Sequence, residues 1–193
     1  LNALGINGAM FQMIAHGLIS AGLFMCVGCI YIRTHTRQID KLGGLARQFP
    51  VIAGFFVFLG LAGLGLPLLV GFAAETITFY GAFISTSFFE INLYWIILPV
   101  SIQFITILCI FGIILTAAYI LWLFQKVLFE QMFSKWKRLI DARIHEVVVL
   151  GVLSLTVLVF GCYPKAVMKI FEPRLTFIAD SLYRQTDKKN VNP

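Results

Sequence analysis

Charge is scarce in this chain of 193 residues. Only 12% of the residues are Asp, Glu, Lys or Arg, and 60% are hydrophobic. Ordinary soluble domains carry about 25% charged residues, so this composition excludes a soluble globular domain. The net charge of +6 comes from loops and the tail, without a basic patch interleaved with aromatics, so no nucleic-acid partner is expected. We predict an all-α polytopic membrane protein surrounded by lipid.

Cysteine is also scarce, and its pattern does not indicate a reactive site. The four cysteines (Cys26, Cys29, Cys109 and Cys162) all lie in apolar stretches. Cys26-x-x-Cys29 has the spacing of a metal or redox motif, but no second Cys or His pair accompanies it, so we interpret it as packing. Neither a nucleophile–base pair nor a phosphate-cradling glycine loop is recognisable. The sequence therefore predicts no catalytic residue for redox chemistry, no cofactor and no metal on this chain.

A recognisable targeting segment is missing. The chain starts with Leu1, without the basic start of a secretory signal or the Arg-rich start of a transit peptide. We expect either a longer polypeptide that was cut or split, or an unusual initiation codon.

Long apolar stretches are abundant, and a membrane-spanning helix needs about 20 such residues. The expected spans are residues 8–32, 51–84, 91–124 and 147–163. As one straight helix the second span would reach about 51 Å, well beyond a hydrocarbon core of about 30 Å. Because proline interrupts helices, we predict a break at Pro67 that divides this span into two half-helices. We expect residues 1–172 to form the bundle and residues 173–193 a peripheral tail.

Basic residues alternate between the expected loops. The loop over residues 33–49 carries four Lys or Arg and the loop over residues 125–146 carries five, whereas residues 85–90 carry none. Under the positive-inside rule both basic loops face the cytoplasm or matrix. The tail would then lie on the opposite side although it carries six basic residues from Lys165 to Lys189, which conflicts with that rule.

Glu75 is the only charged residue in the stretch 51–85. A charge at the bilayer centre costs at least about 2.5 kcal/mol, so such residues are seldom kept without a function. A broken helix beside a buried acid is a recurring arrangement in ion transport. Glu75 is therefore our first candidate for a proton pathway. The alternative is an inert, neutral acid paired with a hydroxyl such as that of Thr78.

Polar residues also recur on the first expected helix. Gln12, His16 and Ser20 are four residues apart and share one face. Histidine titrates near neutral pH, which suits a proton relay. We predict that His16 belongs to the pathway, with Gln12 and Ser20 as weaker candidates. Interhelical hydrogen bonding is the alternative.

The order of short motifs along the chain resembles a known family. The motifs span residues 12–18, 31–37, 43–45, 62–67, 71–75, 115–119 and 161–164. They resemble the C-terminal part of subunit 4 of respiratory NADH:quinone oxidoreductase (complex I), one of its antiporter-like membrane subunits. The resemblance runs from Gly5 to about Glu172. One departure is Leu68, where the family commonly has glycine.

This resemblance implies a fold and a function. The four spans would correspond to helices 11–14 of the antiporter-like fold, with Glu75 as the terminal acid of a central proton axis and His16 on the preceding helix. The chain would translocate protons, driven by redox chemistry elsewhere in the complex, with flavin, iron–sulfur clusters and quinone on other subunits. Its partners would be neighbouring antiporter-like subunits and the N-terminal part of the same subunit, as a separate polypeptide or a missing segment.

Two other functions stay open at this point. One is a subunit of a multi-subunit cation/proton antiporter, and the other is a structural fragment that does not conduct. The Phe- and Ile-rich composition favours the inner mitochondrial membrane, with a bacterial plasma membrane as the alternative.

Overall fold

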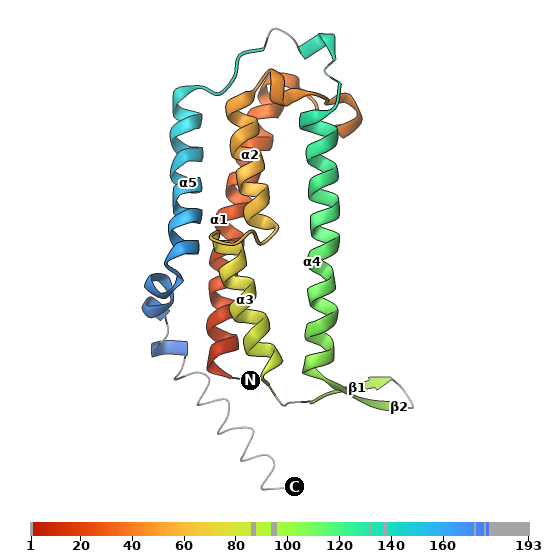
Figure 1. Cartoon of the computed structure of the whole chain (residues 1–193), viewed down its shortest axis with the longest axis vertical. Helices are drawn as coiled ribbons and strands as arrows, with labels where there is room; N and C mark the ends of the chain where they lie inside the picture. Colours follow the sequence, from red (N-terminus) through yellow and green to blue (C-terminus); the bar gives the residue numbers. More distant parts are fainter. Residues whose placement is uncertain are drawn as a thin grey trace, which may run out of the picture.

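The structure is a computed structural model that describes residues 2–85, 88–93, 96–131, 133–136, 139–171, 173–175 and 177. Its long helices run side by side (Figure 1). They are α1 (Ala3–Thr34), α2 (Pro50–Gly63), α3 (Val70–Phe83), α4 (Ile102–Phe124) and α5 (Ile144–Cys162). Within the described residues three of them, α1, α5 and α4 with its following turn, are long and apolar enough to cross a membrane, and α2 is a shorter apolar helix. The predicted polytopic helical fold is confirmed.

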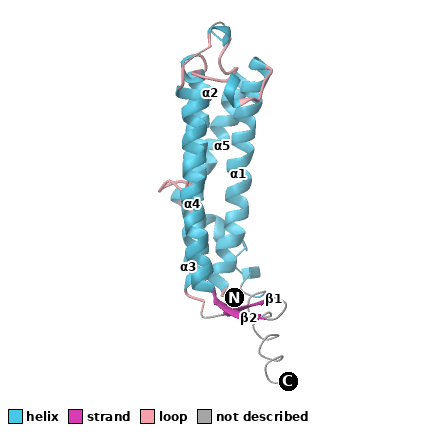
Figure 2. Cartoon of the chain, turned by 90° about the vertical axis from the view of Figure 1, so that its right-hand side faces the viewer, coloured by secondary structure: helices cyan, strands magenta, loops and turns pink. Residues whose placement is uncertain are grey.

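The connections gather at the two ends of the bundle. The loops after α1 and α4 meet at one end, whereas the N-terminus and the hairpin of β1 (Phe88–Leu93) and β2 (Ile96–Ser101) lie at the other (Figures 1 and 2). Short elements in the loops are the 3₁₀ helices Ile39–Lys41, Leu45–Arg47 and Ser134–Trp136 and the π-helical turn Gln125–Phe129. Both loops that the sequence singled out as basic therefore lie at the same end.

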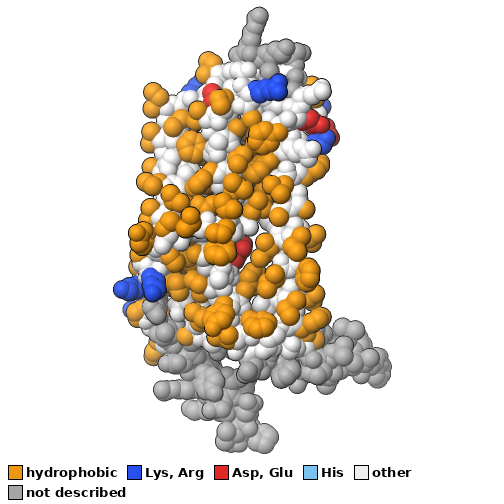
Figure 3. Space-filling model, in the orientation of Figure 1, with side chains coloured by type: hydrophobic (Ala, Val, Ile, Leu, Met, Phe, Trp, Pro, Cys, Tyr) orange, Lys and Arg blue, Asp and Glu red, His pale blue; other side chains and the backbone are white. Residues whose placement is uncertain are grey.

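Hydrophobic side chains cover most of the surface between these ends. On the face in Figure 3, Lys and Arg lie towards the two ends and a broad hydrophobic band lies between them. On α4, for example, Leu115 is 71% exposed and Ile114 is 61% exposed. Such a surface is stable only in contact with lipid or with other apolar helices.

The second predicted span is broken, as expected, and the details of the break follow from its sequence. Helix α2 ends in a Schellman motif, in which the Gly65 N–H donates to Ala62 O and the Leu66 N–H donates to Leu61 O. Gly65 has a φ of 73°, a conformation that glycine adopts at little cost. Pro67 follows, where a regular helix cannot continue. The break thus begins at Gly65, and Pro67 prevents the helix from continuing through it.

The break lies half-way along the bundle. Ile19 of α1 packs against both sides of it, because added Cβ atoms on Gly63 and Gly71 would lie 3.6 and 3.5 Å from its side chain. Ile19 is near the middle of the 32-residue helix α1. The half-helices α2 and α3, of 14 residues each, would measure about 21 Å apiece. Their facing ends therefore meet near mid-membrane depth.

The predicted third span starts too early. A helix over residues 91–101 is wrong, because β1 and β2 pair as antiparallel strands, with Phe88 opposite Ser101 and Leu93 opposite Ile96. Helix α4 begins only at Ile102, where the Ser101 side chain accepts from the Phe104 N–H. Pro99 lacks the N–H that a helix interior needs, and the 23 residues of α4 already measure about 35 Å, enough to cross a bilayer.

Helices α1 and α5 each extend further than the spans 8–32 and 147–163, since α1 begins at Ala3 and α5 begins at Ile144. The helix after Tyr163 covers residues 164–171. The division into a bundle over 1–172 and a tail over 173–193 stays a prediction, and most of that tail, residues 178–193, lies outside the described residues.

Leu68 has a φ of 76°, in the left-handed region that disfavours any side chain with a Cβ. This conformation costs about 1–2 kcal/mol for an L-residue. Because the Leu68 side chain is 68% exposed in this chain, Leu68→Gly should remove this strain with little loss of packing within the chain and stabilise the bundle by about 1 kcal/mol. The measurement is the temperature at which the purified assembly loses its structure.

Leu66→Gly is the matched control, because Leu66 is also exposed but has no positive φ. It should destabilise the bundle by about 0.5–1 kcal/mol, the ordinary cost of glycine. Equal destabilisation by both changes would contradict the strain at Leu68.

Candidate functional site

Glu75 lies in the second turn of α3, just past the break and half-buried. Its Oε2 atom lies only 2.7 Å from the place that a Cβ atom on Gly65 would take. The carboxyl group therefore folds back against the backbone of the broken segment. Within the described part of the chain, no hydrogen bond or ion pair reaches this carboxyl group. A group in this position must be neutral, hydrated or paired with another chain.

Gly65 is a site residue whose role the sequence alone did not reveal. Its positive φ ends α2, and its missing side chain leaves space for the Glu75 carboxyl group. The only signal for it was the run Gly65-Leu66-Pro67, which predicted a break but not a contact ten residues later. Any larger residue at position 65 would both strain the turn and displace the acid.

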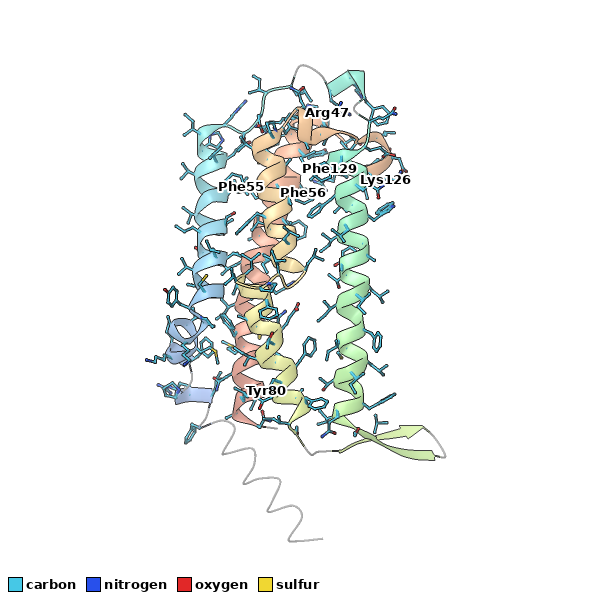
Figure 4. The ribbon with its side chains drawn as sticks, in the orientation of Figure 1. Arg47, Phe55, Phe56, Tyr80, Lys126 and Phe129 are labelled. Carbon is cyan, nitrogen blue, oxygen red and sulfur yellow. The ribbon has the colours of Figure 1, made fainter. Side chains whose placement is uncertain are left out.

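His16 and Ser20 face a second environment, between α1, α2 and α4. They line a cavity of about 370 Å³ whose other walls include Phe56, Ile120 and Phe124. Phe56 and Phe124 meet edge to face with ring centroids 5.6 Å apart, and Phe56 is labelled on α2 in Figure 4. His16 is thus an exposed imidazole at the edge of a largely apolar cavity.

The predicted polar stripe on α1 is only partly connected. The Ser20 hydroxyl donates to the backbone carbonyl of His16, not to its ring. The Gln12 Oε1 atom is buried and has no hydrogen-bond partner among the described residues. No hydrogen bond or ion pair joins His16 to Glu75 within the described chain. A proton could pass between the two groups only through water or through a further chain.

Helix α1 packs tightly against α3 along glycines. A Cβ atom on Gly8 would lie 2.6 Å from Thr78 N, and one on Gly81 would lie 2.5 Å from the Cα atom of Gly5. The two helices run in opposite directions. Gln12 lies one turn after Gly8 in α1, so it is level with the turn of α3 that comes before Thr78. This turn contains Glu75, so the buried amide and the acid share one depth.

An ion pair between α1 and α5 was also missed. The Arg33 guanidinium donates to both carboxylate oxygens of Glu146, at 3.0 and 2.6 Å, and the two side chains are only 9% and 8% exposed. Arg33 also donates to the carbonyls of Cys29, Ile140 and Asp141. Residues 33 and 146 are 113 positions apart, so no local pattern announced this pair.

In the described part of the chain, no three or more His, Cys, Asp or Glu side chains lie close enough together to hold a metal ion. Cys26 and Cys29 are buried free thiols on the packed face of α1.

Comparison with known proteins identifies the family of this chain. Residues 1–106 match the family described as NADH:quinone oxidoreductase/Mrp antiporter, TM. The chain belongs to this family. NADH-quinone oxidoreductase subunit M of Rhodobacter capsulatus is 34% identical over 183 residues, which cover 94% of this chain and 33% of that protein. NAD(P)H-quinone oxidoreductase chain 4 of Acaryochloris marina is 33% identical over 179 residues, which cover 90% of this chain and 31% of that protein.

This member of the NADH:quinone oxidoreductase/Mrp antiporter family therefore spans about a third of the length of these relatives. Among solved structures, respiratory complex I from Thermus thermophilus matches with a TM-score of 0.75 and 28% identity, over 92% of this chain and 34% of that one. The Mrp complex from Dietzia sp. DQ12-45-1b matches with a TM-score of 0.71 but only 16% identity, over 91% and 38%, which shows a shared fold. The chain thus corresponds to the C-terminal part of an antiporter-like membrane subunit.

Proposed function

We propose that this chain is the C-terminal part of subunit 4 of respiratory complex I and contributes part of a proton channel. The observation that carries the proposal is the contact of the Glu75 carboxyl group with Gly65 at a helix break near mid-membrane depth. Facing ends of half-helices carry partial charges and free backbone groups that can bind ions at this depth. An acid held there responds to nearby charge by taking up or releasing a proton.

In this proposal the chain has no redox role of its own. Flavin, iron–sulfur clusters and quinone belong to other subunits, and their reactions change the electrostatic field along the membrane arm. Glu75 responds by exchanging its proton, and His16 relays protons on the neighbouring helix, assisted by Gln12 and Ser20 through water. Two relatives named as quinone oxidoreductase subunits support this assignment, since they are 34% and 33% identical to this chain over the aligned residues.

Exposed residues at the break support a partner chain. Leu66 and Leu68 are 45% and 68% exposed, and Figure 2 shows the connection between α2 and α3 projecting from the bundle about half-way along it. Irregular backbone at membrane depth is tolerated where protein or water covers it, not lipid. We infer that further helices, from the N-terminal part of the same subunit and from neighbouring antiporter-like subunits, cover this face.

A subunit of a cation/proton antiporter is the second candidate, favoured by the shared fold with the Mrp complex. The higher identity to the quinone oxidoreductases argues for complex I. A non-conducting fragment is the third candidate, and an acid at the break to which no described residue donates a hydrogen bond argues against it.

The proposal is tested by isolating an affinity-tagged form of the chain from its native membrane in mild detergent. We expect a large assembly that oxidises NADH, reduces quinone and contains the N-terminal part of the subunit. An assembly of antiporter subunits without flavin would support the second candidate, and a stable, monodisperse monomer would overturn the proposal. Fractionation of the cells decides between the inner mitochondrial membrane, which composition favours, and a bacterial plasma membrane, which the bacterial relatives favour.

A further inference from the structure

Helix α5 ends against the broken segment between α2 and α3. A Cβ atom on Gly161 would lie 2.3 Å from Leu68 O and 2.6 Å from the Cα atom of Leu69. The Cys162 thiol donates to the same Leu68 carbonyl, with Sγ 3.7 Å from the oxygen. In Figure 1 the end of α5 lies level with the connection between α2 and α3. We call this meeting of the last turn of α5 with the backbone of the break the α5 contact.

The sequence at this end of α5 explains why the contact forms here. Glycine inside a helix is less stable than alanine, so Gly161 weakens α5 taken alone but lets two backbones approach closely. The Tyr163 N–H still donates to Val159 O, and Pro164 then prevents the helix from continuing. Helix α5 therefore stops immediately after the residues that touch the break. This gives a physical role to the motif over residues 161–164.

The backbone that α5 touches sets the start of α3. Leu69 is the N-cap of α3 and is only 4% exposed. Its N–H donates to Leu66 O, and its carbonyl accepts from the Ala73 N–H. Glu75 follows Leu69 by six residues, which is less than two helical turns. A shift of Leu69 therefore moves the Glu75 carboxyl group relative to Gly65.

Helix α1 holds the same segment from a second direction. The Ile19 side chain is 7% exposed and lies 3.6 and 3.5 Å from the places that Cβ atoms on Gly63 and Gly71 would take. At the end with the basic loops, α1 and α5 are joined by the ion pair of Arg33 with Glu146. The break is thus held by two helices that are also tied to each other.

The α5 contact leaves no space for a side chain. Ordinary contact of a Cβ atom begins at 3.4 Å, so a methyl group on Gly161 would push the two backbones apart by about 1 Å. Misplacement of a reacting group by about 1 Å can cost about a hundredfold in rate. The position of Glu75 is therefore sensitive to a residue that does not touch it.

We propose that the α5 contact fixes the broken segment and thereby holds the Glu75 carboxyl group against Gly65. Gly161 is the main positioning residue, and Cys162 is the weaker one. Both act through the backbone of the break. The expected effect on pumping rests on the proposed function, whereas the place of the Glu75 carboxyl group can be measured without it.

The test compares two changes from glycine to alanine on α5 in the assembled complex. Gly161→Ala places a methyl group in the α5 contact, and Gly151→Ala is the matched control, because a Cβ atom there meets nothing within 4 Å. The probe is dicyclohexylcarbodiimide, an apolar reagent that reacts with protonated carboxyl groups inside membranes. The mass of the peptide that contains Glu75 reports its modification, and proton uptake is measured in sealed vesicles from the same preparation.

We expect Gly161→Ala to raise the labelling rate of Glu75 several-fold, because the carboxyl group leaves the space against Gly65. Proton uptake should fall by about tenfold or more. Gly151→Ala should change neither value. Equal labelling in the two variants would overturn the α5 contact as a positioning device, even if pumping fell. Faster labelling with normal pumping would support the positioning role and contradict the proposed role of Glu75 as a proton carrier, so the two failures are distinguishable.

Cys162→Ala is the second variant and decides the question if Gly161→Ala does not assemble. Cys162 is exposed, and its replacement removes the bond to Leu68 O without adding an atom to the contact. We expect full assembly and labelling of Glu75 about twofold faster, in line with the loss of a weak S–H···O bond. Cys109→Ala, at an exposed cysteine of α4, is its control and should leave labelling unchanged. The same labelling rate in both cysteine variants would overturn the proposal.

Discussion

Replacing Glu75 with glutamine should leave the complex assembled while the number of protons pumped per NADH oxidised falls sharply. Glutamine keeps the shape and the hydrogen-bonding capacity of the side chain, so it fits the space against Gly65. It cannot bind and release a proton at the pH of the membrane surface, which removes the step that the channel needs. The measurement is proton uptake into sealed vesicles, divided by NADH oxidation in the same sample.

Two further variants show which property of Glu75 matters. Glu75→Asp keeps the acid but shortens its reach, so its effect should be milder than that of glutamine. His16→Ala should cause an intermediate loss, because water can replace a relay group on the wall of the cavity that it lines. A purely structural acid would give the opposite order, with glutamine tolerated and aspartate disruptive through packing. Normal pumping in the glutamine variant would end the proton-carrier assignment.

Replacing Arg33 with alanine should greatly reduce the amount of assembled complex. The change leaves Glu146 as a buried, unpaired carboxylate, and the removal of one partner of a buried ion pair typically costs about 3–5 kcal/mol. It also removes the donors to Ile140 O and Asp141 O, which hold the loop before α5 against α1. The measurement is the yield of intact complex on a native gel and its midpoint temperature of inactivation.

Arg37→Ala is the matched control, because Arg37 carries the same charge but is exposed and lies over the Tyr31 ring at 4.6 Å. It should change stability by less than about 1 kcal/mol, as exposed cation–π contacts do. Arg33→Met combined with Glu146→Leu should restore part of the loss, since apolar side chains can replace a buried pair. Full assembly with Arg33→Ala alone would show that the ion pair contributes little.

The sequence by itself determined the class of the fold and the place of the break. A bilayer admits only long apolar helices, so the stretches that became α1, α4 and α5 were recognisable from composition. The break was also a local property, because Gly65 and Pro67 act on their own backbone. Glu75 stood out for a similar reason, since a lone carboxylate in an apolar stretch needs no partner to be noticed.

The paired strands β1 and β2 show where composition is misleading. Hydrophobicity alone does not distinguish a strand from the start of a spanning helix, so the apolar run from residue 91 predicts a helix that begins too early. Pro99 is the local signal against a helix interior in this run.

Only the tertiary structure decided which side chains meet. The pairing of Arg33 with Glu146 depends on how α1 packs against α5, and these residues are 113 positions apart. The contact of Glu75 with Gly65 depends on the angle at which α3 leaves the break. Gln12 lies at the same depth as Glu75 because Gly8 closely approaches Thr78. Sequence patterns fix what each segment requires of its surroundings, but contacts between distant segments arise from packing, in which every helix constrains the others at once.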